Sequence, residues 1–269
     1  MENVKRIALA ALVVLLAGAA VASARPEAAP TMKPGILVVG VAPPAVNFQV
    51  GTVRGTQVIN PKGYEIDLAR AIAAQLGISK VEWLNVPWTG LFKPGPKSFD
   101  IALQEATITT QREQTVDFSA PYFLANQGVL ISKGTPAPKS LADLRKLQTC
   151  GQSTTTGLAY IQHQLRPQKA PRIYQTTAAA FSAVQSGSCQ AFVMDTPIVA
   201  SQKKAKPSAY GPVAGTIITH ENYGAVLQKG SKLTPYVSAA IKKLVANGTN
   251  GKLQKKWFNL DFSKLPVLK

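Results

Sequence analysis

The chain has 269 residues and a formal charge of +17, with 30 Lys and Arg against 13 Asp and Glu. This length is enough for one large domain or for two lobes of ordinary size. The lysines are dispersed in pairs such as Lys203-Lys204 and Lys242-Lys243, without a basic run interleaved with aromatic residues, which argues against a nucleic-acid partner. We interpret the charge as a solvated surface with some affinity for anionic lipid.

The N-terminus has the features of a secretory signal peptide. Lys5 and Arg6 precede an uncharged run, Ile7 to Val21, and the sequence Ala22-Ser23-Ala24 follows it as an A-x-A cleavage site. The alternative is a membrane anchor, for which this apolar run is short. Cleavage takes away two positive charges and one negative charge, which lowers +17 to +16. We therefore predict an exported, periplasmic protein whose mature chain begins with a Pro/Ala-rich leader.

The first half of the mature chain alternates between strand and helix patterns. Short apolar runs between glycines and prolines are typical of buried strands, and one longer segment has apolar residues at helical spacing before Gly77 stops it. A strand, a helix and further strands in succession favour a parallel α/β sheet. The predicted elements are a strand at Gly35–Pro43, a helix at Gly63–Gly77, and strands at Val81–Val86 and Phe99–Thr109.

A second α/β series lies between two similar strands, Gln127–Gly134 and Glu221–Gly230, which both end in Lys-Gly. Two helices follow the second of these strands. The pattern predicts a chain that crosses into a second lobe and returns, with a cleft between the lobes. The predicted elements of the inserted series are helices at Ser140–Leu147, Thr155–Leu165 and Thr177–Gly187 and strands at Gln148–Ser153, Arg172–Thr176 and Cys189–Asp195; the last helices are at Leu233–Gly248 and Asn250–Phe258.

These elements divide the chain into five parts. We assign a signal peptide (1–24), a leader (25–34), the first part of lobe 1 (35–127), an inserted lobe 2 (128–222) and the return to lobe 1 (223–269).

Cys150 and Cys189 are the only cysteines. An even count in an exported protein favours a disulfide, and the two residues precede or begin strands that we expect side by side. Two buried thiols are the alternative. The two histidines, His163 and His220, have no metal-ligand spacing, so we interpret both as structural or solvated and expect no metal and no cofactor.

Several motifs, in this order and spacing, resemble the periplasmic solute-binding proteins of polar amino-acid ABC transporters, the family 3 extracellular solute-binding proteins. The resemblance covers roughly residues 35–260 and implies a two-lobed α/β fold of the type II periplasmic binding proteins, with two crossing strands and a ligand cleft. The motifs are GYEIDLARAIAAQLG, VPWTGL, FDIALQEATITTQREQTVDFSAPYF, SLADL, GQSTTTGL, AVQSGSCQAFVMDTP and NGTNGKLQKKWF.

The resemblance implies a receptor for an α-amino acid. Arg112 matches the arginine whose planar fork holds the ligand's α-carboxylate, and Thr107 matches the residue that assists it. Asp195 matches the acid that binds the α-ammonium group, and its place at the end of a strand puts it in the crevice of an α/β sheet. A helix-capping aspartate is the alternative for Asp195.

Three further positions are implied contacts. Thr156 and Gln152 lie in the loop that contributes a second anion contact at a helix N-terminus. Trp88 matches an aromatic wall of the pocket, with a buried core tryptophan as the alternative. No nucleophile and base pair is visible, so no catalytic residue is assigned.

The sequence also departs from the family pattern. Such proteins carry an acid and an aromatic residue soon after the first strand, and only Asn47 and Phe48 could replace them here. Gln104-Glu105 stands where a small residue is common; Glu105 either reaches the pocket, which favours a polar or cationic ligand side chain, or points away. We expect a monomeric receptor that delivers its amino acid to an ABC permease. The alternative is an exported enzyme on the same scaffold, such as a cyclohexadienyl or arogenate-type dehydratase.

Overall fold

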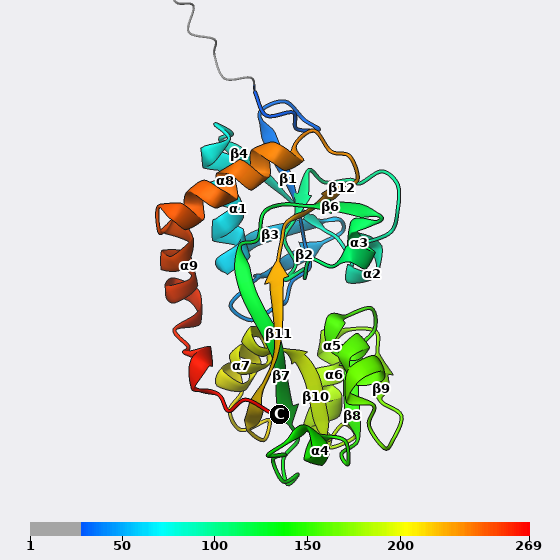
Figure 1. Cartoon of the computed structure of the whole chain (residues 1–269). Coiled ribbons are helices and arrows are strands. Elements are labelled where there is room, and N and C mark those ends of the chain that lie inside the picture. Colours follow the sequence, from blue (N-terminus) through cyan, green and yellow to red (C-terminus); the bar gives the residue numbers. More distant parts are fainter. Residues whose placement is uncertain (1–27) are drawn as a thin grey trace, which may run out of the picture.

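The computed structural model describes residues 28–269, so the predicted signal peptide lies outside the described residues. The chain forms two sheets, one above the other in Figure 1, and helices cover each of them. Two long antiparallel strands run from one sheet toward the other. The predicted two-lobed α/β fold is confirmed.

The first sheet has seven strands in the order β2-β3-β4-β1-β5-β12-β6. Its centre is parallel, because β1 pairs in parallel with both β4 and β5. Helix α1 (Tyr64–Gln75) packs against α8 (Thr234–Ala246) and α9 (Thr249–Phe258), although they are far apart in sequence. The strands are β1 (Ile36–Val41), β2 (Val50–Arg54), β3 (Gln57–Lys62), β4 (Lys80–Asn85), β5 (Ile101–Ala102), β6 (Val116–Phe118) and β12 (Val226–Gln228), and the short helices are α2 (Trp88–Leu91) and α3 (Thr110–Glu113).

The second sheet has five strands in the order β11-β7-β10-β8-β9. Threonine or serine side chains cap three of its helices, because each accepts a hydrogen bond from a backbone N–H of the first turn. The strands are β7 (Phe123–Ile131), β8 (Thr149–Gln152), β9 (Arg172–Tyr174), β10 (Ala191–Asp195) and β11 (Val213–Tyr223), and the helices are α4 (Leu141–Leu144), α5 (Thr156–Tyr160), a π-helix (Ile161–Leu165), α6 (Thr177–Gln185) and α7 (Thr196–Ala205).

Strands β7 and β11 form the connection between the lobes. They are antiparallel, with Phe123 opposite Tyr223 and Gln127 opposite Ile217. The expected single strand at Glu221–Gly230 is wrong, because the chain breaks at Gly224 into β11 and β12. A side chain at Gly224 would meet Ile108 at 3.0 Å, so the backbone passes too close to Ile108 to carry one. The predicted lobe boundaries, 127/128 and 222/223, fall on β7 and β11 and stay a prediction.

Other elements differ from expectation in length. The strand expected at Phe99–Thr109 has only two residues in the sheet, Ile101 and Ala102. The chain turns away soon after them because Glu105 adopts a positive φ of 50°, which interrupts the extended backbone. The β2–β3 hairpin and α7 were not predicted.

The last residues return to the second sheet. The backbone N–H of Thr216 on β11 donates to the carbonyl of Pro266 at 2.7 Å, and that of Leu268 donates to Thr216 at 2.9 Å. Leu268 is buried in the core of the second lobe. The tail after α9 therefore makes a third connection between the lobes, and its end lies beside the lower sheet in Figure 1.

The predicted disulfide is confirmed: Cys150 and Cys189 are joined, at a sequence separation of 39. Cys150 lies on β8, and the neighbouring β10 pairs with β8 in parallel. Closing a loop of about 40 residues stabilises the fold by about 4 kcal/mol in the chain-entropy model.

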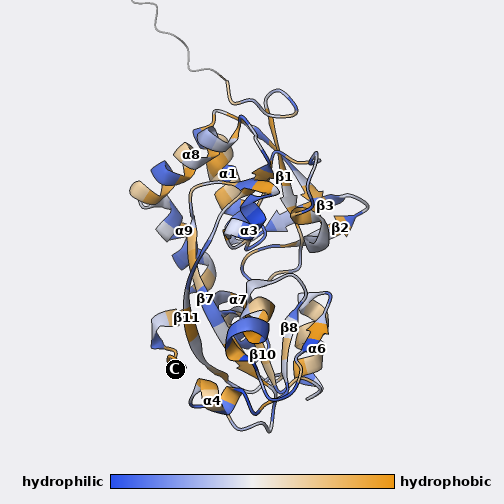
Figure 2. Cartoon of the chain, turned by 45° about the vertical axis from the view of Figure 1, so that its right-hand side comes forward, coloured by the Kyte–Doolittle hydropathy of each residue, from blue (hydrophilic) through white to orange (hydrophobic). Residues whose placement is uncertain are grey.

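Hydrophobic residues form the inner face of α8, where Val237, Ile241 and Leu244 are buried at helical spacing. Hydrophobic and hydrophilic residues accordingly alternate around α8 in Figure 2. Within residues 28–269, no helix is both long and apolar enough to cross a membrane.

Candidate functional site

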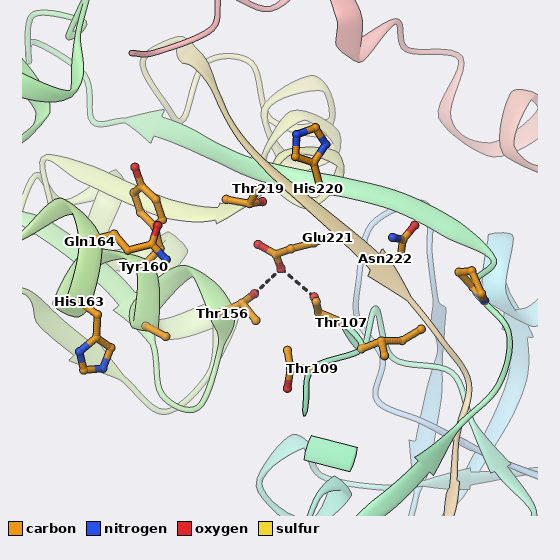
Figure 3. Close-up of a pocket in the computed structure, with 13 residues that line it drawn as sticks. Thr107, Thr109, Thr156, Tyr160, His163, Gln164, Thr219, His220, Glu221 and Asn222 are labelled. Atoms are coloured by element: carbon orange, nitrogen blue, oxygen red, sulfur yellow. Dashed lines mark hydrogen bonds between the residues drawn. The ribbon is translucent and has the colours of Figure 1, made fainter. Parts of the chain in front are cut away.

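A pocket of about 500 Å³ opens between the lobes (Figure 3). Residues from lobe 1, from lobe 2 and from the crossing strand β11 all line it. The two histidines, expected to be structural or solvated, are both exposed and both at this pocket. The lining includes Thr107, Thr109, Thr156, Tyr160, His163, His220 and Glu221.

Arg112 lies on α3, with its guanidinium between the two lobes. The Thr109 hydroxyl accepts the Arg112 backbone N–H at 3.2 Å and so caps this short helix. The guanidinium donates to the carbonyl of Thr107 at 2.7 Å in lobe 1 and to the carbonyl of Thr154 at 3.1 Å in lobe 2. Its centre lies 4.2 Å from the Phe92 ring centroid, within cation–π range.

Arg112 forms no ion pair with any carboxylate of residues 28–269. Burial lowers the pKa of Arg112 to about 10, while the charges of Asp195 and Glu221 act in the opposite sense. The side chain therefore remains a cation near neutral pH. A partly buried guanidinium that is held by carbonyls alone can still accept an anion.

Asp195 ends β10 and is buried, with 3% of its surface exposed. It stands at the start of α7 but its carboxylate makes no capping hydrogen bond there, which argues against the capping alternative. Instead it accepts from the Gln127 amide at 2.8 Å and from the Tyr223 hydroxyl. Burial, followed by the charge of Glu221, raises the pKa of Asp195 to about 6.

Glu221 was not predicted, although its carboxylate lies at the centre of the close-up in Figure 3. It accepts from the hydroxyls of Thr107 at 2.9 Å and Thr156 at 2.6 Å. The Gln127 amide also donates to it, at 2.9 Å. Glu221 thus joins a residue of lobe 1 to a residue of lobe 2.

A bulge in β11 sets the direction of Glu221. The pairing with β7 shifts register between Ile217 and Glu221, and His220 has a φ of 53°. The Asn126 side-chain oxygen accepts the backbone N–H groups of Thr219 and His220, both at 3.0 Å. Such a bulge re-aims the following side chain. Sequence periodicity gave no sign of it, because a bulge interrupts the alternation.

Trp88 is partly buried on α2. Its indole N–H donates to the Thr154 hydroxyl at 2.9 Å, and its ring lies 5.2 Å from the Arg112 guanidinium carbon. Gln152 is buried, and its amide oxygen accepts from the hydroxyl of Thr177, the first residue of α6. The structure therefore brings Trp88 to Arg112, whereas the oxygen of Gln152 is used within lobe 2.

Asn47 and Phe48 could replace the family's acid and aromatic residue near the first strand, but both make other contacts. Phe48 is fully buried in an aromatic cluster with Tyr64, Phe123 and Phe258. The Asn47 amide donates to the Ser201 hydroxyl at 3.0 Å, which is a further contact between the lobes. Phe48 is therefore part of the core and offers no pocket wall.

Glu105 is partly buried and pairs with a second acid, Glu65. Glu65 accepts the Glu105 backbone N–H at 2.8 Å and the Tyr122 hydroxyl, and the Gln49 amide donates to both acids. Burial and the charge of Glu65 raise the pKa of Glu105 well above its usual range. Burial also raises the pKa of Glu65. Burial and the nearness of two like charges both disfavour the ionised forms of these carboxyl groups.

The site therefore places a cation and two carboxylates, Arg112, Asp195 and Glu221, between the lobes. Among residues 28–269, no cluster of three or more His, Cys, Asp and Glu side chains could hold a metal ion. The arrangement can bind a small molecule with both an anionic and a cationic group.

The profile of the bacterial extracellular solute-binding proteins, family 3, matches residues 37–260, and the chain belongs to this family. A probable histidine-binding protein of Neisseria gonorrhoeae is 30% identical over 205 residues, which are 74% of this chain and 75% of that protein. An ABC transporter glutamine-binding protein of Bacillus subtilis is 29% identical over 208 residues, 74% of each chain.

Solved structures agree with the fold. An ancestral arginine-binding protein bound to glutamine has a TM-score of 0.73 and 29% identity, and the match covers 85% of this chain and all of that one. An ancestral amino acid-binding protein, described as a precursor of cyclohexadienyl dehydratase, has a TM-score of 0.71 and 34% identity, with 84% and 96% covered. The fold is that of the type II periplasmic binding proteins.

Proposed function

We propose that this protein captures a free amino acid between its lobes in the periplasm and delivers it to an ABC permease. The observation that carries the proposal is the pair of unmatched charges at the site. Within residues 28–269, the hydrogen bonds of the Arg112 guanidinium go to carbonyls, and the Asp195 carboxylate accepts from an amide and a hydroxyl. The carboxylate and ammonium groups of one zwitterion complement these charges, and each buried charge then gains a partner.

The two lobes make this capture reversible. Hydrogen bonds from Trp88 and Arg112 of lobe 1 to Thr154 of lobe 2 join the lobes. Rotation about β7 and β11 would break these contacts and open the site, which is how two-lobed proteins admit a ligand. A closed, ligand-bound form is the one that a permease would recognise. We propose a monomer, because one chain supplies every group named here.

The names of the relatives support an amino acid as the ligand. They include binding proteins for histidine, glutamine and arginine. All of these ligands share the α-carboxylate and α-ammonium groups, so the shared head group is what Arg112 and Asp195 would hold. Thr107, Thr156 and Trp88 would complete the walls of the site, with Gln152 behind Thr177.

Catalysis is the second candidate, because one structural neighbour is described as a precursor of a dehydratase. A dehydratase needs a general acid, and Glu105 is a carboxyl group whose pKa lies well above its usual range. However, Glu65 and Gln49 already engage Glu105, so we propose binding without chemistry. Chromatography after incubation separates the two, since a binding protein returns every candidate substrate unchanged.

The proposal is tested by a thermal-shift screen of the mature protein against the amino acids. A ligand at a hundred times its Kd stabilises by about 2.7 kcal/mol. We expect Arg112→Ala to lose about 2–5 kcal/mol of binding free energy, because the ligand carboxylate is then desolvated without a partner. Arg112→Lys should also weaken binding of the amino acid, since an ammonium group cannot reproduce the planar fork of the guanidinium.

Arg70→Ala is the matched control. Arg70 also lies over an aromatic ring, 5.4 Å from the Trp83 centroid, and also donates to a carbonyl, that of Pro61, but it pairs with Asp67. Its removal should leave amino-acid affinity unchanged. If Arg112→Ala binds within about threefold of wild type (less than about 0.7 kcal/mol), the carboxylate-receptor proposal is wrong.

A further inference from the structure

Glu221 is a carboxylate that only neutral groups hold. Its three donors are the hydroxyls of Thr107 and Thr156 and the amide of Gln127. No Lys, Arg or His of residues 28–269 forms an ion pair with it. It is partly exposed, and it lines the interlobe pocket of about 500 Å³. A charged group from a ligand can therefore reach it.

Glu221 also lies beside Asp195. A single nitrogen of Gln127 donates to Asp195 at 2.8 Å and to Glu221 at 2.9 Å, so the two carboxylates face the same amide group. Arg112 is the cation whose charge acts on both, and it contacts neither within ion-pair distance. The site therefore has two negative charges for one positive charge.

This charge count discriminates between ligands. A zwitterion with a neutral side chain brings one anionic and one cationic group, which leaves one carboxylate of the site without a partner. A ligand with a second cationic group supplies that partner. Leaving a desolvated carboxylate unpaired costs free energy, so the site should favour the ligand with net positive charge.

We propose that Glu221 is a specificity-determining residue, which accepts the cationic side chain of a ligand whose α-carboxylate is held by Arg112 and whose α-ammonium group is held by Asp195. The ligand class is an amino acid with a guanidinium or ammonium side chain. This inference rests on the proposed function and adds the recognition of the side chain. The hydroxyls of Thr107 and Thr156 orient the Glu221 carboxylate, and the β11 bulge directs it into the pocket (Figure 3).

The test is a titration of two proteins with two ligands that have nearly the same shape. L-Arginine carries a guanidinium group, and L-citrulline carries a neutral urea group in its place. We expect wild type to bind L-arginine at least about 30-fold more tightly than L-citrulline, in the range measured for close charge pairs. We expect Glu221→Gln to lose about 30-fold in affinity for L-arginine and to bind L-citrulline within about threefold of wild type.

Glu113→Gln is the matched control. It removes a negative charge from the exposed face of α3, the helix that carries Arg112, without touching the pocket. This variant should keep the wild-type preference for L-arginine. The preference of the wild-type protein for L-arginine over L-citrulline needs no variant, so a folding defect in Glu221→Gln would leave that part of the test intact.

Two results would overturn the inference while the proposed function stands. One is a wild-type protein without a preference for L-arginine. Such a protein would bind the two ligands equally, or would bind only neutral amino acids and need Arg112 to do so. The other is a Glu221→Gln variant that binds both ligands more tightly, because Glu221 then competes with the ligand carboxylate for the two threonines. If no amino acid binds at all, the proposed function fails as well.

Discussion

Two pairs of carboxyl groups lie close together in this protein, and they differ in what surrounds them. Glu65 and Glu105 are in lobe 1, where the Gln49 amide, the Tyr122 hydroxyl and a backbone N–H occupy their oxygens. Asp195 and Glu221 lie at the crossing strands, where one amide nitrogen of Gln127 serves both. The first pair is satisfied internally, whereas in the second pair Asp195 is buried and Glu221 lines the interlobe pocket.

The difference separates a structural role from a binding role. Burial raises the pKa of both Glu65 and Glu105, so the charged forms of this pair are disfavoured. Asp195 is also buried, and its pKa is raised only to about 6, so it is ionised at neutral pH. A buried acid that stays charged, and that forms no ion pair within residues 28–269, is poised for a cationic ligand group.

Among the substitutions in these two pairs, Asp195→Asn should cause the largest loss of ligand affinity. The amide keeps the shape of the carboxylate but leaves the ligand ammonium without a counter-charge, at a cost of about 2–5 kcal/mol, or about 30-fold to several-thousand-fold in affinity. Calorimetric titration with the best ligand of the screen measures it. The melting temperature of the empty protein should not fall, since the substitution removes a buried charge. Wild-type affinity in this variant would contradict the role of Asp195.

Glu65→Ala should reverse the pattern, with a loss of stability in place of a loss of binding. It leaves the Tyr122 hydroxyl, the Gln49 amide and the Glu105 N–H with a lost acceptor, at about 1–3 kcal/mol for each buried group left unsatisfied. We expect the free energy of unfolding to fall by about 3 kcal/mol in urea denaturation, and ligand affinity to change little. A stable variant with lost binding would make Glu65 part of the site.

The sequence predicted one carboxyl group of each pair. Asp195 ends a strand and Glu105 stands in a family motif, so pattern and resemblance point to both. Glu65 was counted only as part of the helix α1, and nothing local indicates that it meets Glu105, 40 residues away. Glu221 was placed inside an expected strand, where alternation cannot show the bulge that turns it toward Thr107 and Thr156.

The fold shows the same division between local and non-local information. The helix α1, the strands β1 and β10 and the disulfide follow from periodicity, caps and cysteine count, all of which are local or compositional. The break at Gly224 and the tail on β11 depend on contacts with Ile108 and Thr216, which lie far away in sequence. Such contacts leave no periodic signal.

The smallest expected effect is a change of affinity with pH, and it comes from Asp195. Because burial and the Glu221 charge raise the pKa of Asp195 to about 6, its protonated form predominates below that pH in the empty protein. Its contribution to the stability of the empty protein is therefore fully present below its unfolded pKa and lost as pH rises through about 6. Ligand binding has the opposite sign, since an ammonium group needs the carboxylate. We expect ligand affinity to rise about tenfold from pH 5 to pH 7 and to level off above pH 7.

Titration of the protein with ligand at pH 5 and at pH 7 measures this change. Asp195→Asn, which keeps the Glu65–Glu105 pair, should show no such slope. A variant with the wild-type slope would assign the titration to the lobe 1 pair.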